Sequence, residues 1–197
     1  MEHIPFPDKK YQIIYADPPW THSSWKNGNR RPELHYDVMT IDKIKNLPIR
    51  DISDGNCWLF MWTTAPHLKE AFDVIENWGF EYKTIAFNWV KENKKANSLF
   101  WGCGSYTRAN SEFCLLAKRG TIKRISASVH SVIISKIQEH SKKPYEARKR
   151  ILELCGDLPR IELFARNKTE GWDAIGNDID GMDIIKSLEL LAQNINK

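Results

Sequence analysis

The sequence has few of the residues that cross-link a chain or anchor it in a membrane. It contains four cysteines in 197 residues. None lies in a Cys-x-x-Cys pair or has a histidine at zinc spacing, so neither a metal site nor a disulfide framework is indicated. No stretch approaches the roughly 20 apolar residues of a membrane helix, and the amino terminus lacks an apolar signal region. We therefore expect a soluble, cytoplasmic protein with reduced thiols, no bound metal and no membrane contact.

The excess of positive over negative charge is also small. The formal net charge is +4 and the isoelectric point is near 8.8, which favours polyanionic partners only slightly. Basic clusters at 30–31, 94–95, 118–119 and 123–124 suit phosphate contacts. Ordinary solvated surface charge explains any single cluster about as well. The length suits one domain, residues 1–197, with a substantial core.

The tetrapeptide Asp17-Pro18-Pro19-Trp20 directly follows an apolar, aromatic run at 11–16. Such a run predicts a strand, and the two prolines predict a stiff, non-helical loop after it. A carboxylate, free carbonyls and an indole face suit an amino group on a planar heterocycle, such as a nucleobase amine. A proline-rich turn with a capping aspartate and a core tryptophan remains an equal alternative.

The rest of the chain alternates predicted strands and helices. A strand, a helix and a strand at 57–62, 65–78 and 82–90 predict a crossover unit. We expect strands at 112–117 and 121–125 around a turn at 118–120, and we leave 126–137 open between strand and loop. Further predicted elements are helices at 40–47, 145–155 and 182–195 and strands at 160–164 and 172–175.

Several motifs in the same order resemble the MT-A family, which includes the catalytic subunits of the eukaryotic mRNA N6-adenosine methyltransferase. Besides 17–20, the resemblance rests on 59–64, 77–80, 89–91, 141–144, 161–166 and 176–177. It implies an α/β, Rossmann-like class I methyltransferase fold in permuted order, with the catalytic motif first and the cofactor motifs last. The domain core would span about 10–181, with a terminal helix at about 182–195.

The resemblance implies S-adenosyl-L-methionine as cofactor and assigns roles to individual residues. Lys143 would reach the methionine carboxylate, and Arg166 would lie near the ribose. The catalytic set is Asp17, Pro18, Pro19 and Trp20. The cofactor set is Asp17, Lys143, Glu162, Phe164, Arg166, Asn177 and Asp178. The acceptor-side set is Trp25, Tyr36, Tyr106, Arg108 and Glu112.

The residues themselves leave several of these roles open. Asn177 and Asp178 follow a short strand and could offer an amide to an adenine edge and a carboxylate to ribose hydroxyls, or simply form a turn. Glu162 stands in an apolar strand, so it must find donors or lie at the strand end. Trp25 and Tyr36 lie in or next to a polar stretch, and such aromatics more often pack than bind ligand.

The resulting hypothesis is methyl transfer to the N6 amine of adenine in DNA, with the base flipped out of any duplex. Alternatives are the same reaction on RNA, a cytosine-N4 enzyme, or a catalytically silent partner of an active relative. The compact, bacterial or phage type of chain favours DNA and a cytoplasmic, nucleoid-associated location. A homodimer or a heterodimer with a related subunit remains open. The segment 164–167 lacks the glycine-rich loop of many methyltransferases.

Overall fold

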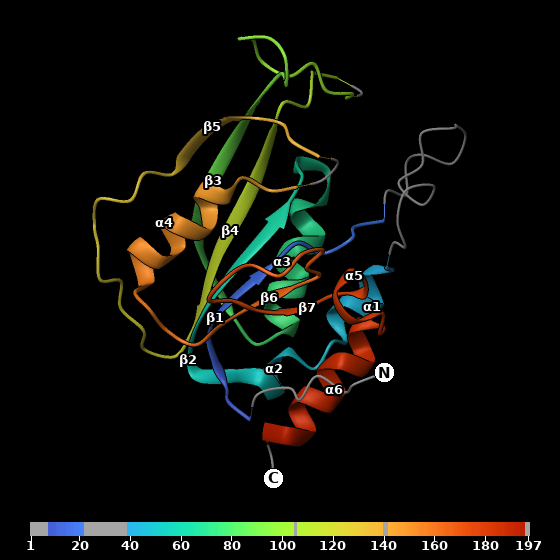
Figure 1. The fold of residues 1–197 in the computed structure, drawn as a ribbon, viewed down its shortest axis with the longest axis vertical. Coiled ribbons are helices and arrows are strands. Elements are labelled where there is room, and N and C mark those ends of the chain that lie inside the picture. Colours follow the sequence, from blue (N-terminus) through green and yellow to red (C-terminus); the bar gives the residue numbers. More distant parts are fainter. Residues whose placement is uncertain (1–7, 22–38, 105, 140–141, 196–197) are drawn as a thin grey trace.

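The computed structural model describes residues 8–21, 39–104, 106–139 and 142–195. Its centre is a seven-stranded sheet in the order β5-β3-β4-β2-β1-β6-β7 (Figure 1). The strands are β1 (Tyr11–Ala16), β2 (Ser53–Thr63), β3 (Glu81–Glu92), β4 (Ser111–Arg119), β5 (Val132–Lys136), β6 (Arg160–Leu163) and β7 (Asp173–Ile175). The helices are α1 (Ile41–Lys45), α2 (Ile49–Ile52), the 3₁₀ turn η2 (Ala65–His67), α3 (Leu68–Asn77), α4 (Tyr145–Cys155), α5 (Asn177–Asp180) and α6 (Ile184–Ile195).

Strand direction determines where the loops of this sheet gather. β4 runs antiparallel to both of its neighbours, β2 and β3, whereas β1, β2, β6 and β7 are parallel to one another, and β3 is parallel to β5. All strands except β4 therefore end at the same edge of the sheet. In open α/β sheets, ligands bind in the crevice outside this carboxyl edge.

Each face of the sheet is covered by helices. In β1, Ile14 and Ala16 point to the core that includes Ala71 of α3 and Leu188 of α6, whereas Tyr15 points to the core that includes Ile151 of α4. Figure 1 shows α4 on one side of the sheet and α1, α2, α3 and α6 on the other. The strands of the centre are buried on both faces, which explains their nearly continuous apolar sequence.

The predicted strand at 121–125 is wrong. β4 ends at Arg119, and the chain from 120 to 131 forms no further strand before β5. A hairpin partner would need a free edge of β4, but β2 occupies one edge up to Arg119 and β3 occupies the other up to Lys118. Gly120 turns the chain with φ +68°, and the side chain of Asn56 accepts the Thr121 N–H at 2.7 Å. The open segment 126–137 contains β5.

For other predicted elements, the type of element is confirmed and the boundaries differ. The predicted helix at 65–78 is η2 followed by α3, and the predicted strand at 57–62 extends to Ser53–Thr63. The crossover from β2 through α3 to β3 joins parallel strands, but β4 lies between them. The α/β architecture is consistent with a Rossmann-like methyltransferase, while the permuted order stays a prediction. Within the described ranges, no helix is long and apolar enough to cross a membrane.

Candidate active site

A cavity of about 980 Å³ opens at the carboxyl edge of the sheet. Residues just after β1, β2, β6 and β7 line it, together with the end of β3, the start of β4 and the segment before α4. Ten predicted site residues line this cavity: Asp17, Pro18, Pro19, Trp20, Glu112, Lys143, Phe164, Arg166, Asn177 and Asp178. The fold thus gathers side chains from both ends of the sequence into one site.

Three of the other predicted residues, all within the described ranges, do not line the cavity. Glu162 lies in β6 below it, and Tyr106 and Arg108 are exposed on the segment between β3 and β4. Trp25 and Tyr36 lie outside the described residues.

Four charged side chains form a chain of ion pairs in the cavity wall. Lys143 Nζ lies 2.7 Å from Asp17 Oδ2 and 3.3 Å from Glu112 Oε2, and Lys91 pairs with the other oxygen of Glu112. Two cations therefore face two carboxylates. Because Lys143 is only 9% exposed, its charge depends on these partners for compensation.

The pKa values in this cluster follow from burial and the alternating charges. Burial by itself lowers the pKa of Lys143, but the carboxylates of Asp17 and Glu112 outweigh it and leave the pKa raised. Burial would raise the pKa of Glu112, but Lys143 and Lys91 lower it to about 2. For Asp17, burial raises the pKa, Lys143 opposes the rise and Glu112 adds to it. Asp17 is thus the carboxylate of this cluster that protonates more readily.

The loop after β1 is fixed mainly through its backbone. The Trp20 N–H donates to the Pro18 carbonyl at 2.9 Å, and the Met39 N–H donates to the Pro19 carbonyl at 3.2 Å. Each carbonyl oxygen has a second lone pair, so the Pro18 carbonyl can accept another donor. The indole of Trp20 is 6% exposed and its N–H donates to the Trp62 carbonyl at 3.0 Å. Trp20 therefore belongs to the core as well as to the cavity wall.

Glu162, which lies in an apolar strand, has hydrogen-bond donors for its carboxylate. Arg148 of α4 donates to its two oxygens, from Nε at 2.8 Å and from Nη2 at 2.5 Å. The same guanidinium lies over the ring of Tyr15, 5.1 Å from its centroid. The Tyr15 hydroxyl in turn accepts the Trp62 indole N–H at 2.7 Å. Glu162 supports the strands beneath the cavity.

The opposite wall of the cavity depends on a glycine. A Cβ at Gly176 would lie 2.1 Å from the carbonyl oxygen of Ala165, so only glycine allows the end of β7 to approach the loop after β6 this closely. Ala165 N–H also donates to the Ile175 carbonyl at 2.9 Å, and Phe164 adopts a positive φ of 61°. This close approach brings Phe164 and Arg166 next to Asn177.

The polar, aromatic segment between β3 and β4 projects beyond the sheet in Figure 1. Phe100 reaches back to line the cavity, whereas Trp101 is 72% exposed and Tyr106 is fully exposed. The Arg108 guanidinium lies 4.9 Å from the centroid of the Trp101 ring. A flat aromatic and a cation are thus presented together to solvent, next to the cavity.

Sequence reasoning missed several residues of this region, among them Thr64, His67 and Met39. Thr64 and Met39 line the cavity, and His67 is buried behind Trp20. The available signal was the sequence Thr-Thr-Ala-Pro-His directly after an apolar strand. Polar residues at the carboxyl end of a buried strand point to a site.

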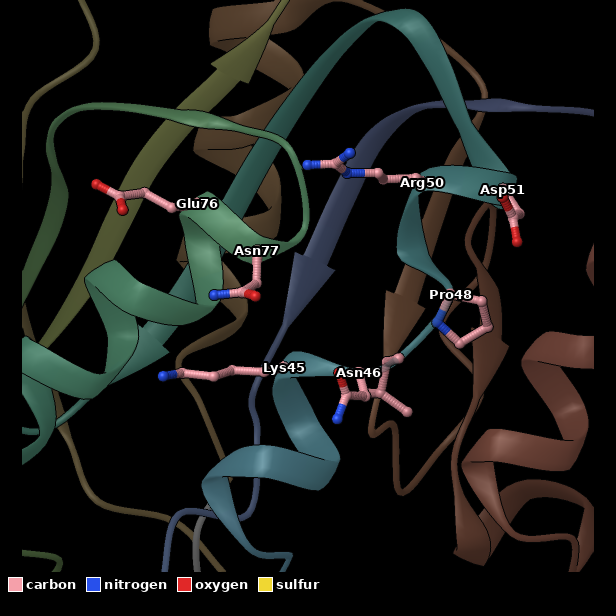
Figure 2. Close-up of a pocket in the computed structure, with 8 residues that line it drawn as sticks. Lys45, Asn46, Pro48, Arg50, Asp51, Glu76 and Asn77 are labelled. Carbon is pink, nitrogen blue, oxygen red and sulfur yellow. The ribbon is translucent and has the colours of Figure 1, made fainter.

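A second hollow, of about 570 Å³, lies among α1, α2 and the end of α3. Figure 2 shows charged and amide side chains around it, with Arg50 and Lys45 extending from different elements. Lys45 is already paired with Asp73 at 3.1 Å. Among the described residues, the lining of this hollow includes none of the predicted site residues, so it offers no competing candidate.

Comparisons with known proteins address the ancestry of the chain. It is 36% identical to the type II methyltransferase M.MunI of a Mycoplasma species over 192 residues, which cover 88% of this chain and 79% of that protein. It is 26% identical to the human N(6)-adenine-specific methyltransferase METTL4 over 87% of the chain and 38% of the relative. Identity is 29% with the N6-methyladenosine RNA methyltransferase MTA1 of Pyricularia oryzae, over 86% of the chain and 47% of the relative. The MT-A70 family model matches residues 11–178, and the chain therefore belongs to the MT-A70 family.

Proposed function

We propose that this protein transfers a methyl group from S-adenosylmethionine to the N6 amine of adenine in DNA. The single observation that carries the proposal is the placement of Asp17 and Lys143, 2.7 Å apart, in the wall of one cavity at the carboxyl edge of the sheet. The names of the METTL4 and MTA1 relatives support adenine as the acceptor base.

The cavity residues suit the cofactor. Lys143 offers a buried cation for the cofactor's carboxylate, and Asn177 offers an amide for its base. Asp178 offers a carboxylate for ribose hydroxyls. The close contact at Gly176 holds the end of β7 against the loop after β6, directly before Asn177. The volume of about 980 Å³ is at the upper end of ordinary ligand pockets and suits a nucleoside-sized cofactor together with an acceptor base. When bound, the cofactor supplies an electrophilic methyl group on a sulfonium.

The chain's own residues have to make a weak nucleophile reactive. The lone pair of the adenine amine is delocalised into the ring. Asp17 and the Pro18 carbonyl would each accept one N–H of this amine, which directs the lone pair towards the methyl group. Transfer would form the N–C bond as the S–C bond breaks, with the bonding pair passing to sulfur, and the amine would then lose its proton to solvent. The contribution is alignment and stabilisation of the developing positive charge.

Exposed residues beside the cavity support a nucleic-acid substrate. Trp101 and Tyr106 offer aromatic faces for unstacked bases, and Arg108 offers a cation for phosphates. DNA is favoured by the 36% identity to M.MunI, which is named as a type II methyltransferase. The chain spans 79% of that relative but less than half of METTL4 and MTA1. RNA is the second candidate, because the MTA1 relative is named as an RNA methyltransferase.

The test is transfer of labelled methyl from S-adenosylmethionine to matched DNA and RNA oligonucleotides, with nucleoside analysis of the product. We expect N6-methyladenine in DNA with the wild type and none with Asp17→Ala. Labelling of RNA alone would leave the chemistry standing and overturn the choice of DNA. A wild type that binds the cofactor yet labels neither polymer would point to a missing partner chain, and absent cofactor binding would favour the silent-partner alternative.

A further inference from the structure

A buried histidine packs directly behind the catalytic loop. His67 ends η2 and is 5% exposed. Its ring stacks on the indole of Trp20, with centroids 5.9 Å apart and planes 17° from parallel. The contact covers one face of Trp20 with a flat, rigid partner.

The two ring nitrogens of His67 bind the loop after β1 and the residue that follows β2. Nε2 lies 3.3 Å from the Thr21 carbonyl oxygen, and Nδ1 lies 2.9 Å from the Thr64 hydroxyl. Because a carbonyl only accepts, Nε2 must carry a proton in this arrangement. In the neutral ring, Nδ1 then accepts from the Thr64 hydroxyl. The bonds thus specify one tautomer and one ring orientation.

These contacts fall on the part of the loop that determines its path. Trp20 and Thr21 directly follow the Asp-Pro-Pro segment, and the Thr21 hydroxyl donates to the Met39 carbonyl at 2.6 Å. The Trp20 backbone N–H in turn donates to the Pro18 carbonyl. A change in the position of Trp20 is therefore transmitted to the Pro18 carbonyl and to the neighbouring Asp17.

We propose that His67 is a positioning residue for methyl transfer, which holds the Asp17–Trp20 loop by stacking on Trp20 and by donating to the Thr21 carbonyl. The inference rests on the proposed function. Loosening the loop would misalign Asp17 and the Pro18 carbonyl against the acceptor amine, and small misplacements of this kind cost up to about 100-fold in rate. Lys143, Asn177 and Asp178 take no part in the stacking or in the two hydrogen bonds of His67, so cofactor affinity should change much less than the rate.

Three variants separate the effect of ring stacking from that of the hydrogen bonds. His67→Phe keeps a stacked ring and removes both hydrogen bonds. His67→Gln keeps a donor near the position of Nε2 and removes the ring. Thr64→Val removes only the hydroxyl partner and is the mildest change. His130→Phe, on an exposed histidine, is the matched control.

Single-turnover methyl transfer should fall by about 10- to 100-fold in His67→Phe, and less in His67→Gln and Thr64→Val. The dissociation constant of S-adenosylmethionine, measured by calorimetry, should change less than about threefold, which a general loss of structure would not allow. Labelling with 5-fluorotryptophan adds a readout independent of activity: the Trp20 resonance, assigned with Trp20→Phe, should shift in His67→Phe and stay in place in His130→Phe.

Two results would overturn the inference separately from the proposed function. An active wild type whose rate and Trp20 resonance are unchanged by His67→Phe would remove the positioning role and leave the function standing. Equal losses of rate, cofactor affinity and thermal stability in His67→Phe and Thr64→Val would assign His67 to stability alone. A wild type that neither binds S-adenosylmethionine nor methylates DNA or RNA, while the Trp20 resonance still depends on His67, would overturn the proposed function and its catalytic consequence but retain the contact.

Discussion

Two ion pairs on neighbouring strands use the same chemistry in different surroundings. Asp17 directly follows β1 and pairs with Lys143 just before α4, whereas Glu162 lies in β6, opposite Tyr15 of β1, and pairs with Arg148 inside α4. The Asp17 side chain is 28% exposed in the cavity wall, and its cation is shared with Glu112. Glu162 is 10% exposed and is held by two hydrogen bonds from one guanidinium.

The Asp17–Lys143 pair can rearrange, whereas the Glu162–Arg148 pair is fixed. Lys143 can exchange Asp17 for an incoming anion, because Glu112 remains beside it and the cavity admits a ligand. Arg148 has no such freedom, since its planar fork already matches both oxygens of Glu162. The resemblance to the MT-A family assigned both carboxylates to the cofactor. The structure leaves Asp17 in the cavity and places Glu162 in its support.

The largest expected effect breaks the first pair at its carboxylate. Asp17→Asn keeps the size of the side chain but removes the charge that we propose accepts the amine N–H. We expect kcat to fall by about 10²- to 10³-fold, as for loss of one electrostatic contact to a transition state. The melting temperature should change little. A variant with near-normal kcat would remove Asp17 from the chemistry.

Lys143→Met tests the other half of this pair. It removes the cation proposed to bind the cofactor's carboxylate, and loss of a hydrogen bond to a charged group costs about 1.5–3 kcal/mol. S-adenosylmethionine should therefore bind roughly 10- to 100-fold more weakly in calorimetry. Lys149→Met, on the exposed side of α4, is the control. Equal affinities of the two variants would contradict the assignment.

Glu162→Gln breaks the second pair and should affect stability instead of chemistry. It leaves the Arg148 guanidinium, which is 16% exposed, without its carboxylate. We expect a loss of about 2 kcal/mol in the free energy of unfolding, or roughly 4–8 °C in melting temperature. Glu146→Gln removes a pair with Arg150 in which the carboxylate is 44% exposed, and it should cost about 0.5 kcal/mol or less. A larger effect of Glu162→Gln on cofactor affinity than on unfolding would return Glu162 to the site.

The same comparison shows how far sequence reasoning reaches. The strand and stiff loop around Asp17 follow from local residues, because two prolines restrict the backbone wherever they occur. The need of Glu162 for donors could also be predicted, but its donor is 14 residues away on a helix. Such a pairing depends on how elements pack. The predicted strand after β4 failed for a related reason, since sheet order decides which strand edges are free. Similarly, His67 could not be predicted as a site residue, because its contact with Trp20 depends on how distant segments pack.

The smallest expected effect is on the pH dependence of kcat/KM, and it tests the different pKa values of Asp17 and Glu112 in the cavity. Burial and the charge of Glu112 raise the pKa of Asp17 against the opposing effect of Lys143. Because the proposed reaction needs ionised Asp17, kcat/KM should fall on the acid side at a higher pH than an ordinary aspartate would give. Glu112→Gln removes one negative neighbour, so the midpoint of this acid limb should move to lower pH. An unmoved midpoint would show that another group controls the limb.

Stability should respond to the same variant in a distinct pH window. The pKa of Glu112 is lowered from 4.5 to about 2 in the folded protein, so its stabilising effect is present above 4.5 and is lost as the pH falls towards 2. The free energy of unfolding of the wild type should therefore exceed that of Glu112→Gln at neutral pH, and the two should converge across this window. Denaturant titrations at several pH values measure both curves. Parallel curves would mean that Lys91 and Lys143 do not stabilise the charge of Glu112 in solution.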